Sequence, residues 1–137
     1  LGNLRQAEAQ FARAIARDSN YARAWAGLAE TILLQPIFFD STRSMPDRLA
    51  GAERAAERAM ALDSTLPEVR LALARTRQSQ FRFRESLDET GRVLALDSSY
   101  ALAWVLRAED QVMLGRPDEA RVAAARAVAA DPLLPLA

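Results

Sequence analysis

The sequence contains no cysteine, no histidine and no lysine, and these absences exclude much enzyme chemistry. Without cysteine or histidine there are no disulfides, no thiolate nucleophile and neither of the commonest zinc ligands. Without lysine there is no Schiff-base chemistry and no phosphate-loop lysine. Glycine-rich phosphate loops and nucleophile elbows are also missing from the sequence. We therefore expect a protein that is not an enzyme, with no catalytic residue, no cofactor and no metal site.

Charge is balanced, because the sequence contains 18 arginines and 18 acidic residues and the formal net charge is zero. Such a chain has no bulk attraction for nucleic acid or for an anionic membrane. The first residues, Leu1-Gly2-Asn3, contain no initiator methionine, basic run or long apolar stretch, so we expect a fragment of a longer cytoplasmic protein. Half of the residues are hydrophobic, with alanine the most frequent, which is enough for the core of one domain over residues 1–137.

An internal repeat is the main signal in the sequence. The segment Asp18–Trp25 recurs as Asp97–Trp104 with six of eight residues identical, and weaker copies begin at Asp63 and Asp131. The copies at Asp63, Asp97 and Asp131 follow one another with a constant period of 34. The step from Asp18 to Asp63 is longer than this period by an insertion of 11. A period of 34 predicts stacked helical hairpins.

Within each period, apolar residues three or four positions apart form two runs, as expected for two amphipathic helices. Gly115 is expected to end a first helix, and Pro117 to open the second helix that follows it. Small residues recur where paired helices must approach closely. They are Ala29, Ala74 and Ala108 in the first helices, and Ala7, Ala14, Ala52, Ala59, Ser86, Val93, Ala120 and Ala127 in the second.

These columns resemble the tetratricopeptide repeat (TPR) family. The resemblance covers nearly the whole chain and rests on the period, on Trp25 and Trp104, on the Leu114–Ala120 segment and on Ala127 before Asp131-Pro132. It implies an all-α, right-handed superhelical solenoid of antiparallel helix pairs, about seven helices in total, whose first helices line a concave groove. It also implies a scaffold that binds a peptide or protein partner. The chain departs from the pattern at Arg70, in a tryptophan column, and at Arg107, in a core leucine column.

The repeat register divides the chain into five parts. Residues 1–19 are expected to be an orphan second helix, residues 20–64 a repeat with an insertion at 35–45, residues 65–98 and 99–132 two further repeats, and residues 133–137 the truncated start of another. Repeats bury their faces only against neighbours. We therefore predict that the exposed ends pair in self-association or that the tail folds onto the last repeat.

Helical faces counted from the matched columns give the residues expected to line the groove. Their mixture of apolar and charged groups suits a peptide better than a small metabolite, although the same pattern fits a face that is merely solvated. The candidates are Arg23, Ala26, Glu30, Leu33, Glu68, Leu71, Arg75, Gln78, Leu102, Val105, Glu109 and Val112.

The insertion carries two adjacent aromatic residues, Phe38 and Phe39. Because each ring can bury about 150–250 Å², exposure to water is costly. We expect the rings to pack on neighbouring helices, and the alternative is a hook for a partner. After them, Ser44 is expected to cap a long helix that runs to Leu62.

Arginines alternate with phenylalanines between Arg70 and Arg84, a pattern that can bind phosphates and stack bases. Because acids lie close by in sequence, we instead expect Arg70 and Arg77 to lie over the core and reach neighbouring carboxylates. Arg107 is expected to form an ion pair with an adjacent helix. Nucleic acid is therefore the less favoured partner.

The favoured function is a non-catalytic scaffold that binds a partner protein through the groove or an end face. Stretches such as Tyr21–Ala29 and Ala55–Asp63 are also similar to arrays attached to bacterial signalling proteins. The alternative is therefore a regulatory or sensor segment of a cyclase-like protein, a kinase or a winged-helix regulator.

Overall fold

The computed structural model describes residues 2–35 and 44–133, and within these ranges it contains seven α-helices and no strand. The predicted all-α fold is confirmed. The helices are α1 (Gly2–Arg17), α2 (Ala22–Leu34), α3 (Met45–Leu62), α4 (Pro67–Ser79), α5 (Phe83–Leu96), α6 (Ala101–Met113) and α7 (Pro117–Ala130).

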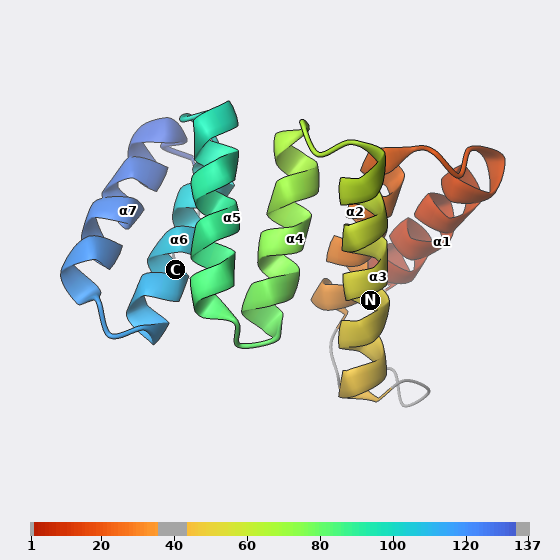
Figure 1. Ribbon diagram of the computed structural model, residues 1–137, viewed down its shortest axis with the longest axis horizontal. Helices are drawn as coiled ribbons and strands as arrows, with labels where there is room; N and C mark the ends of the chain where they lie inside the picture. Colours follow the sequence, from red (N-terminus) through yellow and green to blue (C-terminus); the bar gives the residue numbers. More distant parts are fainter. Residues whose placement is uncertain (1, 36–43, 134–137) are drawn as a thin grey trace.

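The helices stack in chain order, with α1 at one end of the row and α7 at the other (Figure 1). The closest neighbours are the hairpin pairs α2–α3, α4–α5 and α6–α7. Helix α4 also packs against both helices of the preceding pair, and α6 packs against α5 and touches α4. This arrangement is a helical solenoid, in which each pair contacts only its neighbours.

The helix ends follow the local sequence. Ser44 caps α3, because its hydroxyl oxygen accepts a hydrogen bond from the Asp47 backbone N–H (3.2 Å), and Pro117 opens α7 as expected. Gly115, in the turn between α6 and α7, has a left-handed φ of 73°. The equivalent turn of the preceding repeat, between α4 and α5, holds Phe81 at a φ of 61°, a conformation that non-glycine residues rarely adopt.

Small residues build the core, as their recurrence predicts. One buried cluster joins α2, α3 and α4 through alanines such as Ala29 and Ala56 together with Val69. A second cluster joins α4, α5 and α6 through Leu71, Val93 and Leu106. Because alanine has no side chain beyond Cβ, the helix axes approach closely, and larger residues in these columns would separate the pairs.

Arg70 takes over the role of the tryptophan that its column carries in the other repeats. The indole N–H groups of Trp25 and Trp104 donate to the carbonyl oxygens of Ser19 (2.9 Å) and Ser98 (3.0 Å). In the middle repeat the Arg70 Nε–H donates to the Ser64 carbonyl over 2.9 Å. One hydrogen bond therefore ties each first helix to the turn before it, whichever side chain supplies the donor.

The expectation for Arg70 and Arg77 is confirmed. Arg70 forms an ion pair with Glu89 (3.3 Å), and the largely buried Arg77 pairs with Glu53 (2.7 Å) and Glu57 (3.4 Å). These carboxylates neutralise much of the arginine-rich stretch, which argues against an anionic ligand there.

The ion pair predicted for Arg107 is replaced by a hydrogen bond to the backbone. Its partner does lie on the adjacent helix α5, but it is the backbone carbonyl oxygen of Leu87 (3.1 Å), with the Thr90 hydroxyl at 3.5 Å. Because the carbonyl accepts from the guanidinium, no buried carboxylate is needed, and a charge-assisted hydrogen bond links α5 to α6.

Candidate protein-binding surface

The predicted groove residues of α2, α4 and α6 meet in pairs between successive first helices. The Arg23 guanidinium Nε lies 2.5 Å from the Glu68 carboxylate. Farther along the same helices, the Arg75 Nε lies 3.7 Å from a Glu30 oxygen. We call the surface that carries these side chains the first-helix face. Its charges are largely compensated within the protein.

The pairing continues from α4 to α6 through Gln78. Its side-chain amide donates to the Glu109 carboxylate (3.0 Å) and to the Asp110 carboxylate (3.1 Å). Asp110 is fully buried, and burial raises its pKa above the ordinary value, against the opposing hydrogen bond from Gln78. Burial likewise raises the pKa of Glu30, and Arg75 opposes that shift.

The other predicted groove residues divide into core and surface. Leu71 is 2% exposed and belongs to the second core cluster, so it offers no surface to a partner; Ala26 is buried as well. On α6, Val112 is 61% exposed and Leu102 is 39% exposed. Counting columns does not separate these cases, because a first helix packs against neighbours on two sides and keeps only a narrow stripe exposed.

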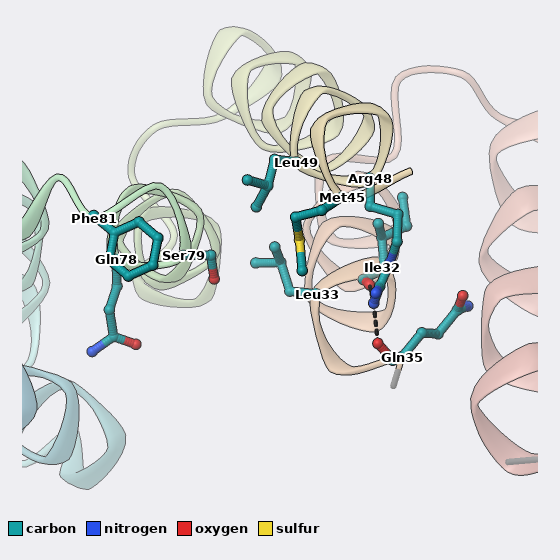
Figure 2. A pocket seen from close by; sticks show the side chains of 9 residues that line it. All are labelled: Ile32, Leu33, Gln35, Met45, Arg48, Leu49, Gln78, Ser79 and Phe81. Atoms are coloured by element: carbon teal, nitrogen blue, oxygen red, sulfur yellow. Dashed lines mark hydrogen bonds between the residues drawn. The ribbon is translucent and has the colours of Figure 1, made fainter. Parts of the chain in front are cut away.

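A pocket of about 260 Å³ lies between the C-terminal ends of α2 and α4 and the start of α3 (Figure 2). Leu33 and Gln78 of the first-helix face line it. The sequence analysis missed its other main walls, Met45, Leu49 and Phe81. Phe81 could have been found by aligning the repeats, because an aromatic residue stands at the position where the last repeat has Gly115.

Arg48 holds one wall of this pocket in place. Its side chain is buried, and its Nη2 donates to the backbone carbonyl oxygens of Ile32 (3.0 Å) and Gln35, the second contact being drawn in Figure 2. These two carbonyls lie at the end of α2, where a helix leaves its last carbonyl groups without intrahelical donors. Arg48 therefore joins the end of α2 to the start of α3.

The two alternatives for Phe38 and Phe39 both stay predictions. These residues lie outside the described residues, so neither packing on neighbouring helices nor binding to a partner is tested. Among the residues at 2–35 and 44–133, no group of three or more acidic residues is placed to hold a metal ion. No helix in these ranges combines the length and the apolar character that crossing a bilayer needs.

Comparison with known proteins places the fold. The structure resembles TTC0263, a thermophilic TPR protein of Thermus thermophilus, with a TM-score of 0.81, 18% identity, and coverage of 97% of this chain and 68% of that one. It resembles MamA with a TM-score of 0.70 and 18% identity, over 96% of this chain and 70% of that one. A third relative in structure is YrrB, described as a TPR protein with an unusual peptide-binding site, with a TM-score of 0.59 and 15% identity, over 96% and 80% of the two chains. No family model and no curated protein matches the sequence.

The architecture is therefore that of a TPR-like solenoid. At these identities the likeness concerns the fold, and it agrees with the class that the repeat period and the tryptophan columns indicate. The described residues have a TPR-like fold in which helix α1 packs on the first of three helix pairs.

Proposed function

We propose that this protein is a non-catalytic scaffold and that its first-helix face binds a peptide segment of a partner protein. One observation carries the proposal: polar residues of three successive first helices contact one another, Arg23 with Glu68, Glu30 with Arg75, and Gln78 with Glu109. Leu33 and Gln78 extend that surface into the pocket at its edge. The described peptide-binding site of YrrB is consistent with this use of the fold.

The charge pairs on this face favour an apolar anchor on the ligand. Arg23 and Glu68, and Arg75 and Glu30, already neutralise one another, so a ligand needs no matching charges there. Pockets for drug-sized molecules usually enclose about 300–1,000 Å³. The pocket of about 260 Å³ is smaller and suits a single large side chain between Leu33 and Phe81. We therefore expect the peptide to insert one bulky apolar residue.

The experiment is a selection from a displayed random-peptide library with the whole chain as the target. Selected peptides are then titrated calorimetrically against the unmodified chain and against Leu33→Arg, which places a charged side chain in the pocket wall. We expect binding to weaken at least tenfold, and replacement of the peptide's bulky residue by alanine to cost about 2 kcal/mol, as for an interface hot spot.

Val122→Arg is the matched control. Val122 is 60% exposed on α7 and lines neither the first-helix face nor the pocket, so this substitution adds the same charge elsewhere. Circular dichroism verifies that both variants keep their helices. Equal binding of the selected peptides to the two variants would show that the first-helix face is not the binding surface. Whether the scaffold belongs to a signalling protein stays a prediction.

A further inference from the structure

The ion pair of Glu30 and Arg75 contains no hydrogen bond. The Arg75 Nε lies 3.7 Å from a Glu30 oxygen, whereas an N–H···O hydrogen bond spans about 2.7–3.2 Å. The pairs of Arg23, Arg70 and Arg77 differ, because in each a guanidinium N–H donates to a carboxylate. Within residues 2–35 and 44–133, no other group forms a hydrogen bond with the side chain of Glu30 or Arg75.

Both side chains are partly removed from water. Only 29% of the Arg75 side chain and 31% of the Glu30 side chain is exposed, and the Arg75 Nε is fully buried without a partner. Burial raises the pKa of Glu30 although Arg75 opposes the shift, so the cation does not fully compensate the desolvated carboxylate. Charged groups in this state gain free energy from a partner that completes their hydrogen bonds.

The pair lies beside the pocket at the ends of α2 and α4. Glu30 precedes Leu33 by three positions on α2, and Arg75 precedes Gln78 by three positions on α4. Residues three apart are neighbours on a helix surface. Because Leu33 and Gln78 line the pocket (Figure 2), a peptide side chain that fills it brings the peptide main chain close to the pair.

The two incomplete groups define the chemistry of their ligand. A carboxylate only accepts hydrogen bonds and a guanidinium only donates them, so the ligand must present one donor and one acceptor side by side. The pair has no net charge, and a ligand of either charge would be repelled by one member. Every main-chain residue except proline carries one N–H and one C=O, and in an extended strand both can bond to the same partner.

We propose that Glu30 and Arg75 together bind one main-chain residue of an extended peptide. The Glu30 carboxylate accepts from the N–H of that residue, and the Arg75 guanidinium donates to its C=O, while a bulky side chain of the peptide fills the pocket. This inference rests on the proposed function and adds how the first-helix face holds the peptide backbone.

The probe is the tightest-binding peptide from the library selection, resynthesised with an ester in place of one amide bond at a time. Each ester removes the N–H of the residue after the bond and makes the carbonyl before it a poorer acceptor. The peptides are titrated calorimetrically against the whole chain. We expect two adjacent esters to weaken binding, because they flank the bound residue. The first should cost about tenfold, through the lost N–H, and the second about threefold, through the weaker carbonyl.

Two protein variants assign these losses to side chains. Glu30→Leu should cancel the loss from the first ester, and Arg75→Leu should cancel the loss from the second. A purely structural effect of either substitution would weaken the amide and ester peptides alike and would leave their difference unchanged. Glu68→Leu is the matched control, since Glu68 lies on the same face but already accepts a hydrogen bond from Arg23. Both ester losses should persist in this variant, and circular dichroism verifies that all three variants keep their helices.

The outcomes separate this inference from the proposed function. If Leu33→Arg weakens binding but no ester does, or if the ester losses persist in Glu30→Leu and Arg75→Leu, the proposed function stands and this inference is wrong. It is also wrong if Glu30→Leu cancels instead the loss caused by replacing an asparagine or glutamine of the peptide with alanine, since the pair would then bind a side-chain amide. If Leu33→Arg leaves binding unchanged, the first-helix face is not the binding surface and both proposals fail.

Discussion

The turn between α4 and α5 allows a test of backbone strain, and the equivalent turn of the last repeat serves as its control. Phe81 has a φ of 61°, in the left-handed region, and the residue is 77% exposed. The equivalent residue in the last repeat is Gly115, at a φ of 73°. A left-handed conformation costs a non-glycine residue about 1–2 kcal/mol, so Phe81 holds the turn at an energetic cost that Gly115 does not have.

Two substitutions at this position separate the contribution of the ring to stability from that of the backbone conformation. Phe81→Ala keeps the strained backbone and loses the edge-to-face contact with Phe83, whose ring centroid lies 6.0 Å away. Phe81→Gly loses the same contact and also releases the strain. We expect Phe81→Gly to be more stable than Phe81→Ala by about 1 kcal/mol, after allowing for the greater freedom of unfolded glycine. Against the unmodified chain, Phe81→Gly should be neutral or slightly stabilised, because an aromatic contact is worth about 0.5–1.5 kcal/mol.

Urea unfolding followed by circular dichroism measures these differences. Gly115→Ala is the reciprocal control, since nothing lies within 4 Å of an added Cβ there and the left-handed φ alone should cost about 1 kcal/mol. A Phe81→Ala protein as stable as Phe81→Gly would refute the reasoning. If Phe81→Gly is also more stable than the unmodified chain, Phe81 is retained at a cost in stability, which supports a role for its ring in the pocket.

Three further predictions follow from the buried groups. Asp110 has a raised pKa in the folded state, so its contribution to stability is lost as pH rises above the unfolded value of about 3.9. Asp110→Asn should therefore gain stability relative to the unmodified chain as pH rises from about 4 to neutrality in urea titrations; a difference independent of pH would contradict this. Leu71→Ala should lower the free energy of unfolding by about 2–5 kcal/mol as a core truncation, whereas Val112→Ala, at an exposed position, should change it by no more than about 0.5 kcal/mol. Equal losses of stability in thermal unfolding would contradict the burial of Leu71. Arg70→Trp keeps an N–H donor for the Ser64 carbonyl and should be about 1 kcal/mol more stable than Arg70→Leu; both variants lose the Glu89 ion pair, so equal stability in urea unfolding would show that the donor does not matter.

Much of the architecture could be predicted from the sequence, because the same residue pattern recurs in each repeat. The repeat period, Pro117 at a helix start and Ser44 at a cap are local signals, and the helices begin where they indicate. The pairing of Arg77 with acids was also predictable, because a charged residue in a buried column needs a compensating group. For the candidate site, the columns selected Glu30 and Arg75, which lie 3.7 Å apart between α2 and α4, while their role in binding stays a prediction.

Spacing along the chain was enough to specify the helices, their pairing in chain order and the small residues between them, since all three recur with the period. Which side chains of a first helix stay exposed depends instead on how the helices pack. Leu71 is buried and Val112 is not, because α6 covers one and no helix in the described part of the chain covers the other. Packing also brings Arg107 to a carbonyl and places Met45 and Phe81 in one pocket, because those contacts depend on distances between segments that no local pattern encodes.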